Sequence, residues 1–338
     1  MGDEKLIGIE GISLGFAGTA DAVQADFDQM REMGLFDEGI KPVYGVLVHH
    51  NPGKGGQNLL ADDPDVYLSP FAGYKEVAEK NGVLLDVLLF HPPGSGLNIV
   101  SSDPEIRKLG LQANKASVDI VEFIGAEEES GPGWFEHMTE DVNIDAALPE
   151  LKEWAAYARS KKKRINAEVL RPDEGGINSI KRGIEIAERV DDPYFFVQGD
   201  LSHQAAVHGP YELPKTMVDA AKSGKLGRYI HASKTAPWKS ADNGGAFLLN
   251  PTAESDPVSF FMPDVIQGLR EVEHETKLVV EVPHGALWGA VGRADPNGYV
   301  GDPENPNMEL LNKIARHETG ISVARVLQAY KQAYSRTG

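Results

Sequence analysis

Short apolar runs alternate along this chain with longer segments in which apolar residues recur every three or four positions. The short runs are typical of buried strands, and the longer segments are typical of amphipathic helices that cover a sheet. We expect strands at residues 5–10, 43–50, 83–91, 126–130, 164–170, 194–199, 228–232 and 277–282. We expect helices at residues 19–33, 70–80, 103–124, 144–162, 177–190, 214–223, 263–274 and within 308–336.

Eight alternating strand–helix units predict an α/β fold, a (β/α)₈ TIM barrel formed by residues 1–338 as a single domain. Such barrels take roughly 250 residues, so the excess length must lie in loops. Two long segments, 233–262 and 283–306, follow the seventh and eighth expected strands. We predict a lid or interface insertion at 233–262 and a C-terminal helix at 308–336. A doubly wound sheet is the rival fold, but residues 11–18 lack the glycine spacing of its phosphate-binding turn.

Composition and charge exclude several kinds of site and partner. The chain has no cysteine, so any metal must use oxygen and imidazole ligands. The 33 Lys and Arg residues against 51 Asp and Glu residues give a net charge of −18, which disfavours nucleic acid as a partner. The apolar run at 83–90 is much shorter than the roughly 20 residues of a membrane span, so we expect no membrane partner. Residues 1–5 do not start like a signal peptide, and we expect a cytoplasmic protein.

Four consecutive expected strands end in residues that can bind a metal ion. These residues are Glu168, Asp200, His231 and Glu281. Glu168 and Asp200 are 32 residues apart, and Asp200 and His231 are 31 apart, close to one βα unit of about 30 residues. Each residue alone fits an ordinary polar strand end, but four at matching positions favour one site, because the carboxyl ends of barrel strands face the active site. Three carboxylates and one imidazole suit Mn²⁺, Mg²⁺ or Co²⁺ and also accept Zn²⁺.

These segments resemble the D-tagatose 3-epimerase-like enzymes, which belong to the xylose isomerase-like superfamily of sugar phosphate isomerases and epimerases. The resemblance rests on the segments EVLRPDE at 168–174, VQGDLSH at 197–203, YIH at 229–231 and VVEVP at 279–283. It covers about residues 100–285 and is specific for the superfamily rather than for a substrate.

The resemblance implies a metal site and an enolising chemistry. It implies that one divalent ion, Mn²⁺ by our expectation, is held by Glu168, Asp200, His231 and Glu281. Glu168 and Glu281 would also move protons at the substrate carbon through a cis-enediol, with His203 as a further catalytic residue. Glu174 would contact substrate hydroxyls. The family often has an arginine after the seventh strand, where Lys234 is the nearest cation in this chain.

Other residues near expected strand ends are candidates for substrate binding. His50 and His91 end the second and third strands, and His284 follows the eighth. Each of these histidines is also compatible with a structural role in a loop. Trp134 and Trp288 lie in loops on the expected catalytic face, where an indole ring packs either against a sugar or into the core.

Three functions from different classes remain open. The first is a metal-dependent sugar isomerase or epimerase that works as a homo-oligomer. The second is a metal-dependent lyase that resembles the α subunit of C-glycoside deglycosidases, which act on 3-oxo C-glycosides with a small β subunit; a keto-inositol dehydratase fits the same site. The third is a metal-free sugar-binding barrel, which the four ligand positions oppose. An endonuclease of the related three-zinc type is opposed by the net charge of −18.

Overall fold

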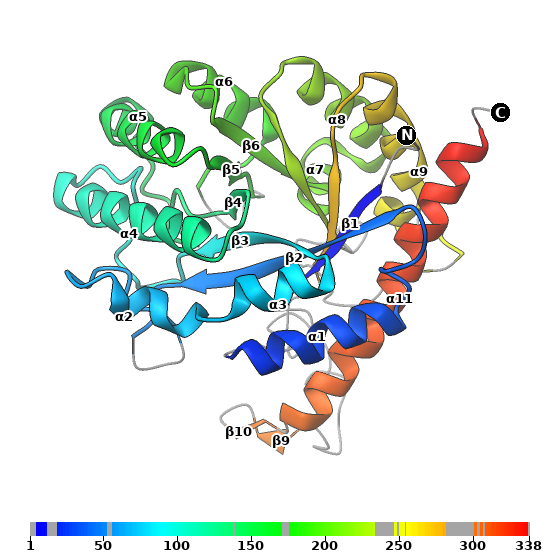
Figure 1. Ribbon diagram of the computed structural model, residues 1–338. Helices are drawn as coiled ribbons and strands as arrows, with labels where there is room; N and C mark the ends of the chain where they lie inside the picture. The colour runs from blue at the N-terminus through cyan, green and yellow to red at the C-terminus, as the bar shows by residue number, and fades with distance from the viewer. Residues whose placement is uncertain are drawn as a thin grey trace.

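Within the described residues, eight parallel strands close into a barrel in the order β1 to β8, and helices surround it (Figure 1). The computed structural model describes residues 5–11, 19–52, 56–137, 139–170, 176–233, 247–248, 250–253, 255–281, 301–302, 305–306 and 308–336. β1 pairs in parallel with both β2 and β8, which closes the barrel. The predicted (β/α)₈ TIM barrel is therefore confirmed.

The eight strands lie close to the ranges that the apolar runs predict. They are β1 (Lys5–Glu10), β2 (Ile40–His49), β3 (Leu84–Phe90), β4 (Glu128–Gly131), β5 (Arg164–Glu168), β6 (Phe195–Asp200), β7 (Leu226–Ala232) and β8 (Lys277–Val280). A short antiparallel pair, β9 (Gly301–Asp302) and β10 (Asn305–Pro306), lies outside the barrel sheet. The rest of the predicted 283–306 loop falls outside the described residues.

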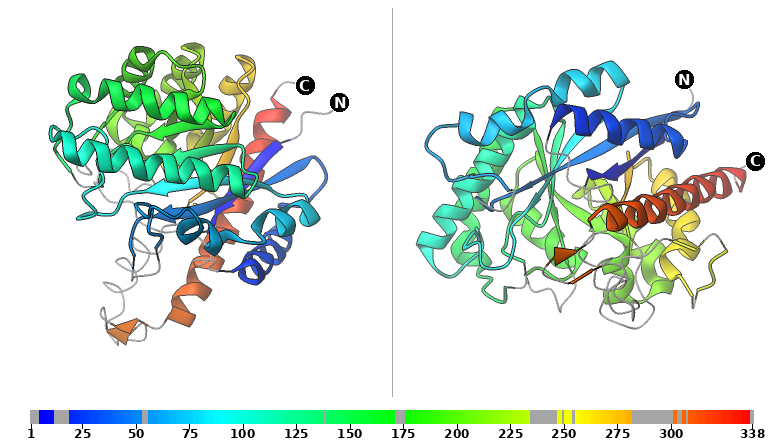
Figure 2. Two further views of the ribbon diagram at one scale, coloured as in Figure 1. Left: turned by 60° about the vertical axis from the view of Figure 1, so that its left-hand side comes forward. Right: turned by 90° about the horizontal axis from the view of Figure 1, so that it is seen from below.

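The helices follow the predicted alternation, with additional short elements. They are α1 (Ala20–Glu32), α2 (Asp65–Leu68), η2 (Ser69–Phe71), α3 (Tyr74–Asn81), α4 (Pro104–Phe123), α5 (Ile144–Ser160), α6 (Ile180–Val190), α7 (Leu201–His208), η4 (Pro210–Glu212), α8 (Leu213–Lys222), α9 (Pro257–Glu271) and α11 (Met308–Ser335). α11 is the predicted C-terminal helix, and it packs on the outside of the barrel along α9 (Figure 2). Among the described residues, no helix is long and apolar enough to cross a bilayer.

Polar residues cap the helices where the sequence places them. The side chain of Thr19 accepts a hydrogen bond from Ala22 N at the start of α1, and Asp103 accepts one from Glu105 N at the start of α4. Ser179 does the same for α6 through Arg182 N. These caps satisfy N–H groups that a helix leaves without an internal partner.

The helix after the seventh strand begins earlier than predicted. α9 starts at Pro257, whereas the sequence pattern placed its start at residue 263. Asp256 accepts a hydrogen bond from Ser259 N, and a proline in the first turn needs no N–H partner. These two residues explain why the helix starts at Pro257. The segment predicted as an insertion at 233–262 therefore ends earlier than expected, where α9 begins. Residues 234–246 lie outside the described part of the chain.

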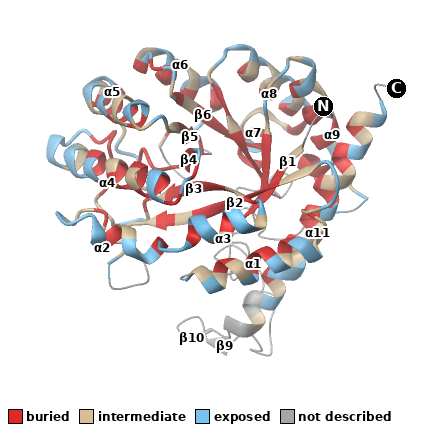
Figure 3. Cartoon of the chain, in the orientation of Figure 1, coloured by how far each residue is buried: buried red, intermediate tan, exposed pale blue. Residues whose placement is uncertain are grey.

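The core lies between the barrel and the helices. The strands are mostly buried, whereas helices such as α4 and α5 show one buried and one exposed face (Figure 3). Large side chains such as Phe27 of α1 and Trp154 of α5 fill this layer. The core thus holds the strand ends in register.

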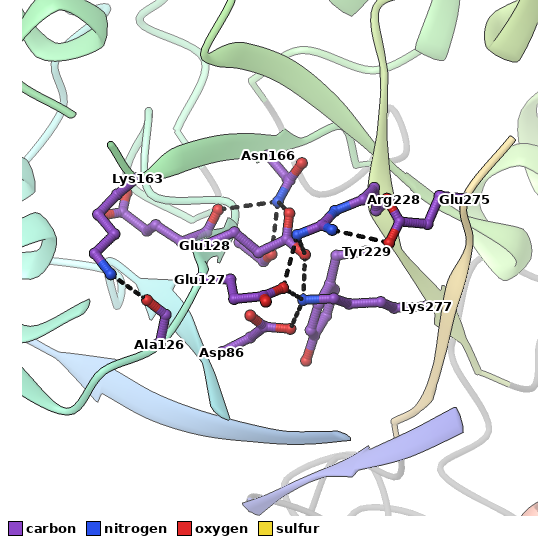
Figure 4. A network of polar contacts seen from close by, with 12 residues as sticks. Asp86, Ala126, Glu127, Glu128, Lys163, Asn166, Arg228, Tyr229, Glu275 and Lys277 are labelled. Atoms are coloured by element: carbon purple, nitrogen blue, oxygen red, sulfur yellow. Dashed lines mark hydrogen bonds and ion pairs between the residues drawn. The ribbon is translucent and has the colours of Figure 1, made fainter. Parts of the chain in front are cut away.

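The barrel interior also contains buried charges near the amino ends of the strands (Figure 4). Lys277 Nζ of β8 lies 2.7 Å from Asp86 Oδ2 of β3 and 2.6 Å from Glu128 Oε1 of β4. Asn166 donates a hydrogen bond to Glu128 Oε2 at 2.8 Å, and Arg228 approaches Glu128 Oε1 at 3.3 Å. This network explains how Glu128 is accommodated inside the barrel at the start of β4, although glutamate has a low β propensity.

Candidate functional site

Four side chains from adjacent strand ends meet at the carboxyl end of the barrel around His231. Its Nδ1 lies 2.8 Å from Glu168 Oε1, 3.4 Å from Glu281 Oε2 and 3.7 Å from Asp200 Oδ2. Ligand atoms of Glu168, Asp200 and His231 all lie within 4.8 Å of one another. The structure brings together the four residues that the spacing singled out, and their role as metal ligands stays a prediction.

Strand register sets this convergence. Asp200 at the end of β6 pairs with His231 on β7, and His231 pairs with Val279 on β8, two residues before Glu281. The β6–β7 pairing shifts between Val197 and Gly199, an irregularity that re-aims side chains next to a site. The carboxylates and the imidazole therefore face one point.

The sequence analysis missed a fifth carboxylate, Glu10, at the end of β1. Its Oε1 lies 2.5 Å from His231 Nε2, on the side of the ring away from Nδ1. Tyr229 donates a hydrogen bond to the same oxygen at 3.2 Å. Glu10 stands at a strand end like the four residues that were recognised, so the same positional rule would have found it.

Burial and mutual repulsion control the protonation of this cluster. Burial raises the pKa of Glu168 and raises that of Glu281 well above its ordinary value. Burial alone lowers the pKa of His231, but the facing carboxylates, first Glu10 and then Glu168, outweigh burial and raise it well above its ordinary value. The side chain of Glu281 keeps 19% of its surface exposed, whereas that of Asp200 is fully buried. Glu281 is therefore more accessible to a substrate than Asp200.

The donor set fits a divalent metal ion. Several carboxylates around one imidazole carry more negative charge than a single imidazolium can balance, and a divalent cation corrects this excess. Oxygen ligands together with one nitrogen suit Mn²⁺ and Mg²⁺. Glu168, Asp200, His231 Nδ1 and Glu281 are the groups that would hold such an ion.

His203 lies beside this cluster because α7 begins at the end of β6. Asp200 Oδ1 accepts hydrogen bonds from Ser202 N at 2.5 Å and from His203 N at 3.0 Å, which caps the helix. Asp200 Oδ2 accepts another from Ser233 Oγ at 2.9 Å. The His203 side chain lies close enough to Glu168 to lower the pKa of that carboxyl, although burial is the larger effect and raises it. The role of His203 as a catalytic residue stays a prediction.

The two candidate histidines directly after β2 and β3 make structural contacts. His50 Nδ1 accepts a hydrogen bond from Leu59 N at 3.1 Å. His91 is fully buried, its Nε2 lies 2.8 Å from Asn114 Oδ1 of α4, and burial lowers its pKa to about 4. His91 is therefore neutral near pH 7. Substrate binding by either histidine stays a prediction.

Trp134 belongs to the core rather than to an open pocket wall. It is fully buried and packs against Phe195 at 6.0 Å between ring centroids. Its Nε1 donates a hydrogen bond to the backbone oxygen of Glu168 at 2.7 Å. The indole thus fixes the end of β5, from which the Glu168 side chain projects.

The remaining predicted substrate contacts cannot be placed against this geometry. Glu174, Lys234, His284 and Trp288 lie outside the described residues. Their roles stay predictions.

Comparisons with known proteins agree with the fold. The sequence profile described as xylose isomerase-like TIM barrel matches residues 47–291. Solved structures similar to this chain include an L-ribulose 3-epimerase, with 14% identity, a TM-score of 0.67 and coverage of 99% of this chain and 98% of that one. A D-allulose 3-epimerase from Methylomonas sp. in complex with D-allulose has 15% identity, a TM-score of 0.65 and 98% coverage of both chains.

A D-psicose 3-epimerase from Clostridium cellulolyticum H10 with D-tagatose has 16% identity and a TM-score of 0.63, and the match covers 95% of this chain and 99% of that one. No curated protein matches this chain in the sequence comparison. At these identities, the structural similarity establishes the shared barrel.

Proposed function

This chain belongs to the xylose isomerase-like TIM barrel family, and from that premise we propose that it is a divalent-metal-dependent sugar isomerase or epimerase. The observation that carries the proposal is the arrangement around His231 Nδ1. Carboxylate oxygens of Glu168, Glu281 and Asp200 lie 2.8, 3.4 and 3.7 Å from that atom. They do so at the end of the barrel where such enzymes have their active sites. The similar structures named as sugar 3-epimerases support this choice.

In this proposal, the four strand-end residues hold one divalent ion, Mn²⁺ by preference. When bound there, such an ion would polarise a substrate carbonyl and lower the pKa of the neighbouring C–H group. Glu168 and Glu281 then serve as the proton-transfer pair. Burial raises the pKa of both carboxyl groups, which makes their carboxylates better bases toward a carbon acid.

The direction of proton return decides the reaction. One carboxylate removes the proton next to the carbonyl and leaves an enediolate, which becomes the cis-enediol when the former carbonyl oxygen takes up a proton. Return of a proton to the same carbon from the opposite face by the other carboxylate gives the epimer. Return to the neighbouring carbon gives the aldose–ketose isomer. Glu281 is the partly exposed member of the pair and takes the role nearest the substrate. His203 is proposed to assist by contacting a substrate hydroxyl.

An unphosphorylated sugar is the proposed substrate class. Glu10, Glu168, Asp200 and Glu281 concentrate negative charge at this end of the barrel. These carboxylates would repel a phosphate group placed near them, and one divalent ion would not offset that repulsion. The protein is proposed to act as a homo-oligomer without a second polypeptide.

Deuterium exchange tests the proposal. The protein is loaded with Mg²⁺ and incubated in D₂O with a panel of free ketoses and 3-oxo glycosides, and the products are followed by NMR. We expect deuterium next to the carbonyl of a ketose, and we expect Glu281→Gln to abolish this exchange. Glu129→Gln changes a buried glutamate of β4 outside the His231 cluster and is the matched control, with exchange retained.

Two results contradict the proposal. One is the absence of exchange with every sugar although the protein binds the metal. The other is release of an aglycone from a 3-oxo C-glycoside, which would identify the carbon–carbon lyase described above instead.

A further inference from the structure

Glu10 contacts the nitrogen of His231 that does not face the candidate ligands. Its Oε1 lies 2.5 Å from Nε2, while Nδ1 of the same ring faces Glu168 at 2.8 Å. Nδ1 and Nε2 occupy different edges of an imidazole ring, so one atom cannot serve both. Glu10 therefore contacts the edge of the His231 ring opposite the candidate metal ligands and does not take the place of one of them.

The position of Glu10 depends on a dedicated environment. The residue is fully buried, and Tyr229, two residues before His231 on β7, donates a hydrogen bond to the same Oε1 at 3.2 Å. The Tyr229 and His231 rings meet edge to face with centroids 5.5 Å apart. Tyr229 thus contacts both Glu10 and His231 and helps to hold the two side chains in place.

A glycine leaves space for the Tyr229 hydroxyl beside Glu10. Gly45 of β2 pairs with Glu10 of β1 in the barrel register. A Cβ atom at Gly45 would lie 2.4 Å from the Tyr229 hydroxyl and 3.4 Å from Glu10 Cγ. Any side chain at this position would displace the hydroxyl. Three strands, β1, β2 and β7, therefore cooperate to hold the Glu10 carboxylate.

We propose that Glu10 is a positioning residue, which fixes the His231 ring with its proton on Nε2 and so presents Nδ1 to a divalent metal ion. The inference rests on the metal site of the proposed function. A carboxylate behind a metal-binding histidine sets the tautomer and orientation of the ring and increases its strength as a ligand. Losing such a partner typically weakens metal binding by about 10–100-fold.

Metal titration is the first test. The Mn²⁺ dissociation constant is measured by calorimetry for the wild-type protein, Glu10→Gln, Glu10→Ala and Tyr229→Phe. We expect a loss of about 10–100-fold for the Glu10 variants and a smaller loss in the same direction for Tyr229→Phe. Glu129→Gln, which makes the same chemical change at another fully buried glutamate site, is expected to bind Mn²⁺ as the wild type does.

A spectroscopic readout separates positioning from a structural role. The protein is labelled with ¹⁵N-histidine and loaded with Zn²⁺, which is diamagnetic. The Nε2–H proton of His231, assigned from its absence in His231→Gln, is expected far downfield because a carboxylate faces it. In Glu10→Gln this resonance is expected to move upfield, and in Glu129→Gln it is expected to stay. If Glu10→Ala does not fold, Glu10→Gln and this resonance decide the question.

Three outcomes overturn the inference. An unchanged Mn²⁺ affinity in folded Glu10→Gln, together with an unmoved resonance, means that Glu10 does not position the ring. A loss as complete as that of Asp200→Asn means that Glu10 is itself a ligand. A wild-type protein that binds no divalent ion overturns the proposed function and this inference with it, whereas the first two outcomes leave the proposed function standing.

Discussion

Lys277 and Asp86, which are 191 residues apart in the sequence, form an ion pair inside the barrel with 2.7 Å between Nζ and Oδ2. Neither side chain is exposed to solvent. Burial lowers the pKa of Lys277, but Asp86 and then Glu128 outweigh burial and raise it above its ordinary value. The barrel interior therefore contains a charged ammonium near the amino ends of the strands, and this ammonium pairs with carboxylates of β3 and β4.

Removing this ammonium should strongly destabilise the fold. Lys277→Met leaves Asp86 buried without its cation and leaves Glu128 with Arg228 alone. Breaking a buried pair costs about 3–5 kcal/mol. Urea denaturation at pH 7 measures the loss. The control is Lys215→Met, which removes an exposed pair with Asp219 that solvent screens and that should contribute little to stability. Equal effects of the two substitutions would contradict a stabilising role for the buried network.

The stability of the protein should fall as the pH rises from about 5 to 8, in part because of Glu129. Burial raises the pKa of this carboxyl to about 8 from 4.5. The folded state therefore keeps a proton that the unfolded state loses in this range, and the slope from one such group approaches about 1.4 kcal/mol per pH unit.

Glu129→Gln removes this proton-binding group, so its stability relative to the wild type should increase steadily over the same range. Urea midpoints at pH 5.5, 6.5 and 7.5 check the trend. A constant difference between the two proteins would show that Glu129 does not titrate in the folded state.

Trp134 should support catalysis through the backbone of Glu168. Trp134→Phe removes the hydrogen bond from Nε1 to the Glu168 oxygen, which is worth about 1 kcal/mol. We expect kcat to fall about tenfold, with little change in KM, because the proton-transfer carboxylate is displaced. Trp154→Phe is the matched control, since Trp154 Nε1 is buried and has no hydrogen-bond partner in the described part of the chain. A larger loss of kcat in Trp154→Phe would argue against this role.

Divalent metal should stabilise the folded protein. A ligand that binds only the native state at about 100 times its Kd adds about 2.7 kcal/mol. Thermal unfolding with Mn²⁺ and after removal of the metal by EDTA measures this difference. Asp200→Asn is expected to lose the stabilisation by Mn²⁺. Asp219→Asn, on the surface of α8, is expected to retain it. A gain that persists in Asp200→Asn would place the ion elsewhere.

Periodicity alone predicted the barrel because its strands are buried on both faces. Runs such as Leu84–Phe90 are nearly continuous in apolar residues, and the intervening helices repeat their apolar positions regularly. The strand expected at 126–130 is rich in glutamate, which has a low β propensity. In the structure β4 spans Glu128–Gly131, and Glu128 finds its partners only when β4 lies near Lys277 and Arg228.

Tertiary context explains what the pattern missed. α7 buries five consecutive residues, Leu201 through Ala205, so it shows no helical periodicity in its sequence. Its start is instead set by Asp200, which was considered only as a metal ligand. Glu10 was overlooked although it ends the strand expected at 5–10, because the strand-end rule was not applied to that strand. Closure of the barrel places β1 beside β8 and brings Glu10 to His231.

The central claim is that four strand-end side chains hold one divalent ion. Anomalous diffraction from a crystal soaked in Mn²⁺, recorded on both sides of the manganese edge, tests it most directly. The account predicts one strong peak within coordination distance of Glu168, Asp200, His231 Nδ1 and Glu281. The absence of a peak there, with manganese bound elsewhere or not at all, would contradict it.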